Sequence, residues 1–256
     1  MKNYFVLTDQ VALVTGATGG LGKAISIGLA EAGANIIAVG RNKIVLEEVI
    51  KDIRNLGRRA LAIYADIINV NDVQEMVKRS IAEFGQIDVL VNCAGISGPM
   101  KLFKDYGESE WSDIFKTNLN GTLLCTKYVG EAMIKRKKGK VINIASVLGT
   151  IGTYFTAPYS ITKAGIIQFT KSIALEWSRF NILVNSISPG MFETEMVKDI
   201  IGDPKAREVI IQGTPLRKIG KPEDIVGLVI FLASDASNHI TGENISIDGG
   251  FSMSKY

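Results

Sequence analysis

Residues 11–22 read Val-Ala-Leu-Val-Thr-Gly-Ala-Thr-Gly-Gly-Leu-Gly, and this stretch decides the fold. Its first four residues form an apolar run of strand length, and a glycine-rich turn then leads into a helical pattern over 21–32. Glycines in such a turn let the main chain approach a pyrophosphate, whose negative charge is favoured at the N-terminal end of a helix. The spacing differs from the Gly-x-Gly-x-x-Gly dinucleotide fingerprint, so a nucleotide site and a merely tight turn both stay open.

The rest of the chain alternates between strand and helix patterns. Runs rich in Val, Ile and Leu predict strands at 11–15, 36–39, 60–64, 88–91, 140–145, 182–187 and 244–248. Helical periodicity between them predicts helices at about 21–32, 43–56, 70–84, 110–135, 158–179 and 222–234. Several strand runs are apolar throughout, as in strands covered on both faces. We therefore expect an α/β fold with a single doubly wound parallel seven-stranded sheet and helices on both faces.

A second chemically informative segment runs from Ser146 to Lys163. Tyr159 and Lys163 stand four residues apart, which places a phenol and an ammonium on one face of a helix. Because a nearby cation stabilises phenolate, we expect Lys163 to lower the pKa of Tyr159 so that the pair exchanges protons near neutral pH. The Ser146 hydroxyl could hold a carbonyl or alcohol oxygen opposite them. Taken alone, a tyrosine and a lysine at this spacing are more often a solvated surface pair.

Several separated motifs, in this order, resemble the short-chain dehydrogenase/reductase family over nearly the whole chain. They are Thr15-Gly16-x-x-x-Gly20-x-Gly22, Asp66, Asn92-Cys93-Ala94-Gly95, Thr117-Asn118-Leu119-Asn120-Gly121, Ser146, Tyr159-x-x-x-Lys163 and Pro189-Gly190-x-x-x-Thr194. The resemblance implies a Rossmann-like fold and an oxidoreductase that moves a hydride between a nicotinamide cofactor and a ketone or secondary alcohol. It also implies that the motifs meet at the carboxyl ends of the strands, where ligands bind in such sheets.

The family's residue roles carry over to matching positions. The catalytic residues implied are Asn118, Ser146, Tyr159 and Lys163, with Tyr159 as general acid/base and Asn118 helping to hold a water. The cofactor-binding residues implied are Thr15, Gly16, Gly20, Leu21, Gly22, Arg41, Asp66, Ile67, Asn92, Ala94, Gly95, Tyr159, Lys163, Pro189, Gly190, Phe192 and Thr194. In the family's arrangement Asp66 meets the adenine, Asn92 supports the turn beneath it, and Thr194 lies near the nicotinamide.

The turn Val39-Gly40-Arg41-Asn42 bears on which cofactor is used. A carboxylate at the end of the second strand accepts the ribose hydroxyls of NAD(H), whereas a basic residue there favours the 2′-phosphate of NADP(H). Glycine occupies the family's acidic position here and arginine follows it, so NADP(H) is favoured. The alternative is that Arg41 faces solvent, in which case NAD(H) is also permitted.

Composition fits one compact catalytic unit. The chain has 256 residues, of which 46% are hydrophobic and 21% charged, and no linker or repeat divides it. We expect a single domain over 1–256, with a substrate lid at about 191–217 because that connection is long and mixed in character. A net charge of +3 is too small to indicate nucleic-acid binding. The basic run 135–140 is expected to end a helix, stopped by its glycine.

Other function classes find little support. No apolar run is long enough to span a membrane and the N-terminus lacks a signal-peptide pattern, so a cytoplasmic location is expected. Cys93 and Cys125 show no metal-ligand spacing, and no metal site or disulfide is expected. A Ser-His-Asp hydrolase would have to use His239, the single histidine, and the chain has no Gly-x-Ser-x-Gly elbow.

The substrate stays open at this stage. The chain is similar both to 3-oxoacyl-carrier-protein reductases and to sugar-acid dehydrogenases such as gluconate 5-dehydrogenase. Lys101, Lys104 and Arg217 could form a docking patch for a carrier protein only if they converge. The alternatives are an NAD(H)-dependent sugar-acid or alcohol dehydrogenase and, more remotely, a non-catalytic nucleotide sensor.

Assembly is expected as well. The family commonly forms tetramers, and Ile166, Phe169, Ile173 and Trp177 make an apolar stripe on the helix that bears Tyr159. Either this stripe packs on its own sheet or it contributes to a homotetramer or homodimer interface.

Overall fold

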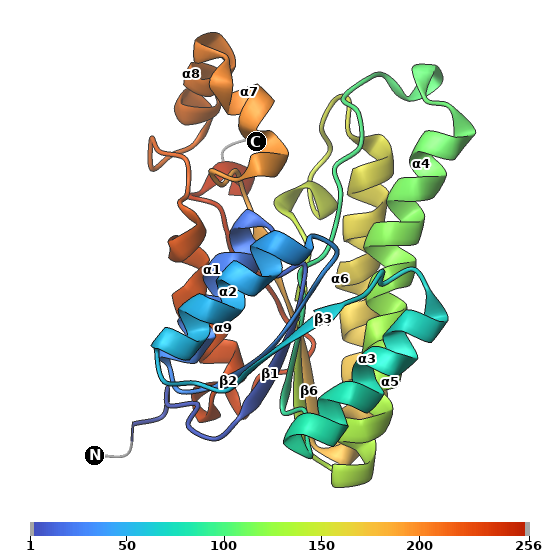
Figure 1. The fold of residues 1–256 in the computed structure, drawn as a ribbon. Coiled ribbons are helices and arrows are strands. Elements are labelled where there is room, and N and C mark those ends of the chain that lie inside the picture. Colours follow the sequence, from blue (N-terminus) through green and yellow to red (C-terminus); the bar gives the residue numbers. More distant parts are fainter. Residues whose placement is uncertain (1–2, 254–256) are drawn as a thin grey trace.

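The computed structural model describes residues 3–253. Its centre is a parallel seven-stranded sheet with the order β3-β2-β1-β4-β5-β6-β7 (Figure 1). The strands are β1 Val11–Thr15, β2 Asn35–Gly40, β3 Ala60–Tyr64, β4 Val89–Asn92, β5 Gly139–Ile144, β6 Ile182–Pro189 and β7 Asn244–Ile247. The predicted fold class is confirmed. The strand order reverses between β1 and β4, and a crevice forms at such a switch point.

Helices cover both faces of the sheet (Figure 1). They are α1 Gly20–Glu31, α2 Lys43–Asn55, α3 Val70–Phe84, α4 Glu108–Ile114, α5 Gly121–Arg136, α6 Ala157–Trp177, α7 Lys198–Gly202, α8 Pro204–Gly213 and α9 Val226–Ala233. One hydrophobic cluster joins the sheet to α1, α2 and α9, and a second joins it to α3, α5 and α6. Among the described residues, no helix is both long and apolar enough to cross a membrane.

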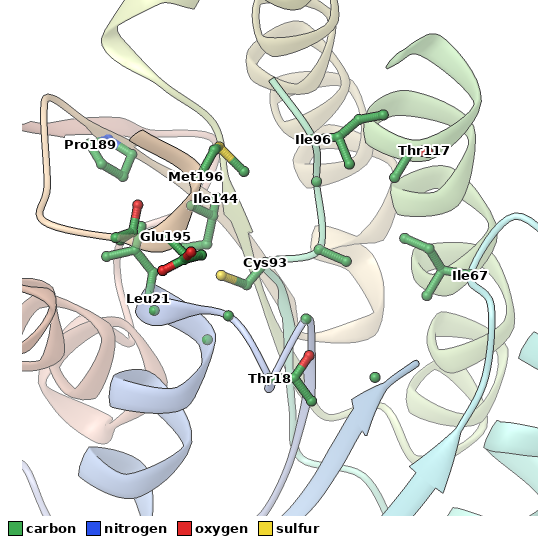
Figure 2. A pocket seen from close by; sticks show the side chains of 18 of the residues that line it. Thr18, Leu21, Ile67, Cys93, Ile96, Thr117, Ile144, Pro189, Glu195 and Met196 are labelled. Atoms are coloured by element: carbon green, nitrogen blue, oxygen red, sulfur yellow. The ribbon is translucent and has the colours of Figure 1, made fainter. Parts of the chain in front are cut away.

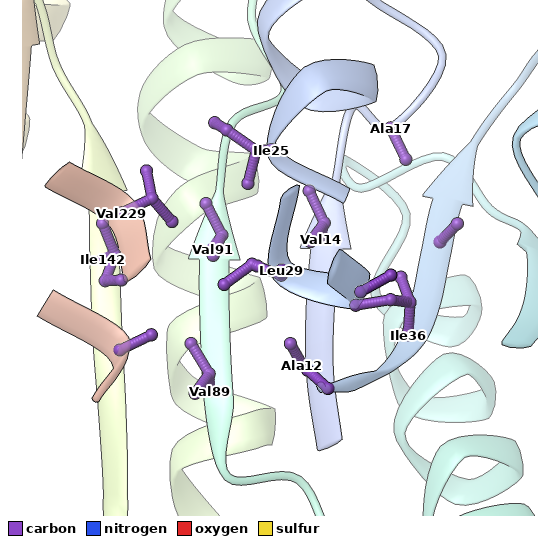
Figure 3. Close-up of a cluster of buried hydrophobic side chains, with 14 of the residues drawn as sticks. Ala12, Val14, Ala17, Ile25, Leu29, Ile36, Val89, Val91, Ile142 and Val229 are labelled. Atoms are coloured by element: carbon purple, nitrogen blue, oxygen red, sulfur yellow. The ribbon is translucent and has the colours of Figure 1, made fainter. Parts of the chain in front are cut away.

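The first cluster fixes the glycine-rich turn in place. Figure 3 shows Ala12 and Val14 of β1 beside Val91 of β4, with Leu29 of α1 packed over them. All four side chains are fully buried. Since a buried apolar side chain stabilises the fold by about 1.5–3 kcal/mol, this packing holds the start of α1 rigidly against the strand ends.

The predicted helix over 110–135 is wrong in one respect, because it is interrupted. A π-helical segment, Phe115–Asn120, separates α4 from α5. A π turn inserts one residue into the helical repeat, which sequence periodicity over so short a stretch does not reveal. The predicted helix at 222–234 likewise begins as a 3₁₀ segment, Pro222–Ile225, before α9.

One smaller expectation also needs correction, and one alternative left open by the sequence can be narrowed. The helix that precedes the basic run is not stopped by its glycine: α5 ends at Arg136, Lys137 adopts a left-handed conformation with φ 52°, and Gly139 already belongs to β5. The apolar stripe on α6 is covered largely within the chain. Ile166 is buried, and Trp177 lies over Gly130 of α5, where a Cβ would come 2.1 Å from the indole ring.

Candidate active site

A cavity of about 400 Å³ lies at the carboxyl ends of the strands. Its wall takes residues from segments that are far apart in the chain, including Thr18, Cys93, Ile144 and Pro189 (Figure 2). The predicted site residues on this wall are Gly16, Gly20, Leu21, Gly22, Arg41, Asp66, Ile67, Ala94, Gly95, Ser146, Tyr159, Lys163, Pro189, Gly190, Phe192 and Thr194. The predicted residues Thr15, Asn92 and Asn118 lie behind the wall.

The glycine-rich turn forms the floor of the cavity because its glycines leave no room for side chains. Gly16 has φ +70°, and a Cβ there would lie 2.8 Å from the main-chain nitrogen of Ala94. A Cβ at Gly22 would lie 2.1 Å from the carbonyl oxygen of Gly16. Main-chain atoms therefore line this part of the cavity, and a cradle of that kind fits a pyrophosphate.

Thr15 ties the turn to the neighbouring strand from below. Its hydroxyl accepts hydrogen bonds from the main-chain N–H groups of Cys93 (3.1 Å) and Ala94 (3.2 Å) and donates to the carbonyl of Val91 (3.4 Å). Thr15 therefore fixes the geometry of the cavity floor without facing the cavity.

Asn92 supports the same region from the core. Its amide nitrogen donates to Thr126 (2.9 Å) on α5 and to Asn143 (2.8 Å) on β5. Its side-chain oxygen is buried and has no partner among the described residues. An ordered water is the usual partner for such an atom.

Ser146, Tyr159 and Lys163 come together where the turn after β5 packs against α6. Gly149 makes this contact possible, because a Cβ there would lie 2.7 Å from the main chain of Lys163. Pro158 occupies the first turn of α6, where its missing N–H costs no hydrogen bond. The Lys163 amine donates to the carbonyl of Ile144 (2.8 Å) and lies 5.5 Å from the centre of the Tyr159 ring.

Burial, rather than the cation, dominates the titration of this pair. Desolvation raises the pKa of Tyr159 to about 12, and hydrogen bonding with Ser146 only partly opposes the rise. Desolvation also lowers the pKa of Lys163 to about 8. The expected lowering of the tyrosine pKa is therefore wrong for the cofactor-free protein, because burial penalises the charged form of each group.

Asn118 lies in the π-helical segment and holds the wall at Ile96. Its amide group accepts from the Ile96 N–H (2.8 Å) and donates to the Ile96 carbonyl (2.8 Å) and to Thr162 (3.2 Å). A Cβ at Gly95 would lie 3.2 Å from the side-chain oxygen of Asn118 and 3.7 Å from the Lys163 nitrogen. Asn118 therefore lies directly behind Gly95, next to the lysine. π turns are often found at functional sites.

The far end of the cavity is bordered by Gly40, Arg41 and Asp66. The Arg41 guanidinium lies 3.8 Å from the Asp66 carboxylate, and 69% of its side chain is exposed. A Cβ at Gly40 would lie 2.8 Å from the methyl group of Thr18. No larger side chain fits at this position unless Thr18 moves.

The segment after β6 covers the floor. Thr194 packs onto the glycine-rich turn, where a Cβ at Gly20 would lie 2.7 Å from the Thr194 methyl group. Glu195 and Met196 follow it on the wall (Figure 2). Sequence reasoning missed both of these residues and also Thr18. A hydroxyl inside a glycine-rich turn was an available signal for Thr18, whereas Glu195 and Met196 gave none.

The three cations that could form a docking patch, Lys101, Lys104 and Arg217, each have a partner of their own. Lys101 contacts both carboxylate oxygens of Glu110 (2.5 and 2.7 Å), and Lys104 contacts Asp105 (2.8 Å). Arg217 donates to the main chain and side chain of Gln212. The three cations therefore have separate partners and form no shared patch in these contacts.

Comparison with known proteins agrees with this geometry. Residues 16–252 match a family described as enoyl-(acyl carrier protein) reductase. The chain is 39% identical over 249 residues to a 3-oxoacyl-[acyl-carrier-protein] reductase of Synechocystis sp., covering 96% of this chain and 98% of that one.

Solved structures extend the similarity. A gluconate 5-dehydrogenase from Burkholderia cenocepacia, in complex with NADP and tartrate, is 32% identical with a TM-score of 0.94, and 98% of each chain is covered. An NAD+-bound xylitol dehydrogenase is 32% identical with a TM-score of 0.92, covering 95% of this chain and 99% of that one. The similarity runs from the glycine-rich turn to the last strand. The chain therefore belongs to the short-chain dehydrogenase/reductase family and is an oxidoreductase of hydroxyl or carbonyl groups.

Proposed function

We propose that this protein catalyses NADP(H)-dependent interconversion of a ketone and a secondary alcohol, with uncharged 3-oxoacyl compounds such as thioesters as its substrates. The observation that carries the proposal is the convergence of Ser146, Tyr159 and Lys163 on the cavity whose floor is the glycine-rich turn. The 3-oxoacyl-carrier-protein reductases similar to this chain support the substrate class.

In the proposed mechanism Tyr159 donates a proton to the substrate oxygen during reduction, and the nicotinamide, when bound, supplies the hydride. Because burial holds the Tyr159 pKa at about 12, the phenol is protonated at neutral pH and is ready to act as an acid. The Ser146 hydroxyl orients the same oxygen.

Lys163 is proposed to hold the nicotinamide ribose and to stabilise phenolate after proton transfer. An ammonium has three donors, and the bond to the Ile144 carbonyl uses one of them. The Asn118 amide hydrogens bond the Ile96 carbonyl and Thr162, so a relay water would have to donate to an oxygen of Asn118. The side-chain oxygen accepts from the Ile96 N–H (2.8 Å), and the main-chain carbonyl accepts from the Thr122 hydroxyl (2.8 Å).

The preference for NADP(H) is proposed from the turn after β2. Gly40 carries no acidic side chain to accept the ribose hydroxyls of NAD(H), and one there would have to displace the Thr18 methyl group. Arg41 lies next to that position and its largely exposed guanidinium is available for a 2′-phosphate. A related gluconate 5-dehydrogenase is in complex with NADP, whereas a related xylitol dehydrogenase is bound to NAD+, so the family alone does not decide.

An uncharged substrate is proposed from the charges at the catalytic end of the cavity. The charged residues on that part of the described wall are Lys163 and Glu195. Lys163 is engaged with Ile144 and, in the proposed mechanism, with the ribose. Glu195 offers a substrate carboxylate no cation, and its side chain, which is 81% exposed and pairs with Lys198 (3.1 Å), adds only a repulsion that solvent screens. A 3-oxoacyl ester or thioester fits this wall better than a sugar acid does.

The proposal also includes a lid and an assembly. Residues 191–217, which contain α7 and α8, are proposed to close over the substrate. A homotetramer is proposed because Ile161 and Leu175 of α6 are 52% and 81% exposed. Light scattering at micromolar concentration measures the assembly directly.

The test compares two ketones that share one acyl chain, of which one ends in an ethyl ester and the other in a free carboxylate. Ethyl 3-oxobutanoate and free 3-oxobutanoate share the reacting carbonyl, and their reduction is followed with NADPH and with NADH. We expect kcat/KM with NADPH to be roughly three- to tenfold higher for the ester, since this part of the wall offers the acid no unengaged cation. Preference for the acid, or for a keto sugar acid, would instead support a sugar-acid dehydrogenase. No turnover of any ketone would support a nucleotide sensor.

A further inference from the structure

Two loops form the rim above the catalytic residues. One, residues 97–106, leaves the cavity wall after Ile96, and the other, residues 150–156, joins the turn of Ser146 to the helix of Tyr159. They run near each other above the sheet, opposite α7 and α8 (Figure 1). Both loops connect directly to the cavity wall, because Ile96 precedes the first and Ser146 and Tyr159 flank the second.

A single tyrosine hydroxyl joins the two loops. The single proton of the Tyr106 hydroxyl is shared between the main-chain carbonyl of Pro99 in its own loop and, at the longer distance of 3.3 Å, that of Phe155 in the other loop. The Lys101 N–H donates to the same Phe155 carbonyl (3.3 Å). We call this group of contacts the Tyr106 clasp.

The clasp is anchored on α4. Glu110 accepts from the N–H of Gly107 (2.7 Å) at the start of that helix and binds Lys101 through both carboxylate oxygens. The Lys101 amine in turn lies 5.2 Å from the centre of the Tyr106 ring. Tyr106 is therefore held from below by a helix and not only by its own loop.

The backbone conformation of Phe155 indicates that these contacts do more than stabilise a turn. Its φ is +68°, a left-handed conformation that is costly for a bulky aromatic residue. Such strain persists only where the surroundings enforce it, and it is most common at ligand-binding and catalytic sites. The enforcing contacts here are the two hydrogen bonds to the Phe155 carbonyl, four residues before Tyr159.

The rim that results is apolar. Met100, Phe103, Tyr154 and Phe155 are 54%, 63%, 81% and 46% exposed, and the Tyr154 and Phe155 rings lie 6.0 Å apart. Exposed apolar side chains in this number, beside a cavity, are suited to an apolar ligand segment.

We propose that Tyr106 is a positioning residue that holds Phe155 in its strained conformation and so shapes a rim for the apolar chain of the substrate. The proposal rests on the proposed function, since it assumes a ketone with such a chain. The clasp affects the binding of the apolar chain of the substrate and not the position of the reacting carbonyl. Its loss should therefore affect long substrates and spare short ones.

The test replaces Tyr106 with phenylalanine, which keeps the ring over Lys101 but removes the hydroxyl. Ethyl 3-oxooctanoate and ethyl 3-oxobutanoate are compared at saturating NADPH. In Tyr106→Phe we expect KM for the long ester to rise about three- to tenfold, as for the loss of one shared hydrogen bond, with kcat within about twofold. Both constants for the short ester should stay at the wild-type values. Tyr64→Phe, which removes a hydroxyl bonded to Glu47 on the surface, is the matched control.

A second variant isolates the strain. Phe155→Gly accepts a positive φ without help, so removing the Tyr106 hydroxyl in that background should raise KM no further. Equal effects on both esters, a fall in kcat alone, or an unchanged KM for the long ester would each overturn the proposal. So would additive effects in the double variant.

Amide hydrogen exchange separates this inference from the proposed function. If wild type reduces neither ester, the proposed function fails, but the clasp can still be tested. Exchange over 150–156 should be several-fold faster in Tyr106→Phe than in wild type, and unchanged in Tyr64→Phe. Unchanged exchange in both variants would show that no clasp exists.

Discussion

The cavity has two sides of different construction. Its cofactor floor, residues 11–22, 39–41 and 92–95, consists largely of main-chain atoms in contact, and Gly16 and Gly22 have no room for even one methyl group. Its substrate rim, residues 97–106, 147–156 and 191–217, presents exposed apolar side chains such as Tyr154 and Leu216. The shape of the floor is therefore set by close main-chain contacts that exclude side chains, whereas the shape of the rim is set by exposed apolar side chains.

Backbone strain also differs between the floor and the rim. On the floor, the positive φ occurs at Gly16, where it costs little. On the rim, Phe155 and Arg217 adopt positive φ, and strain of this kind costs about 1–3 kcal/mol per residue. Backbone strain is therefore concentrated at non-glycine residues of the rim, while the floor uses glycine for the same conformation.

The largest expected effect lies where floor and rim meet. Tyr159→Phe keeps the ring but removes the transferable proton, so kcat should fall by about 10²–10⁴-fold while the Kd for NADPH stays within about threefold of wild type. Single-turnover kinetics and fluorescence titration measure the two quantities. Near-normal turnover by the folded variant would rule out the proposed acid/base role.

An effect of intermediate size on NADPH affinity is expected when one methyl group is added to the floor, and none when it is added to the rim. Gly22→Ala places a Cβ 2.1 Å from the Gly16 carbonyl, and the overpacking should weaken NADPH binding by about 10- to 100-fold. Gly152→Ala is the matched rim variant, because a Cβ there meets no atom within 4 Å, and its NADPH affinity should match wild type. If both variants bind NADPH equally well, the floor is more compliant than its close contacts imply.

The smallest expected effect concerns the exposed edge of the floor. Arg41→Ala should weaken NADPH binding by roughly tenfold and leave NADH binding nearly unchanged, since a largely exposed charge pair is screened by solvent. Lys43→Ala removes a neighbouring cation that does not line the cavity and should alter neither affinity. Equal losses of both cofactors in Arg41→Ala would place the arginine outside the 2′-phosphate site.

The sequence allowed the sheet to be predicted nearly to the residue because buried parallel strands are apolar throughout and are separated by helical periodicity. The π turn at Phe115–Asn120 escaped prediction, since a single inserted residue hardly changes that periodicity. The short helices α7 and α8 also escaped, because five and ten residues are too few to show a clear pattern.

The candidate site was also predictable only in part. Motif residues such as Gly16 and Ser146 could be placed from strand ends alone, because parallel strands all end at one edge of the sheet. The direction of the Tyr159 pKa shift could not be predicted, since helical spacing gives a shared face but not the depth at which that face is buried. The Tyr106 clasp was equally hidden, because its bond to Phe155 joins residues 49 positions apart.

The contact between α1 and α9 has a consequence for how the chain folds. All four strands around the floor lie within the first 92 residues and are adjacent in the sheet, so they can assemble early during synthesis. Yet Gly28 of α1 is shaped to receive Val226 of α9, with a Cβ position only 2.1 Å from the valine methyl group. Until the ribosome has released the last thirty or so residues, α1 shows an apolar, grooved face to the cell. The packing around the first helix is therefore completed only when the last α-helix has been made.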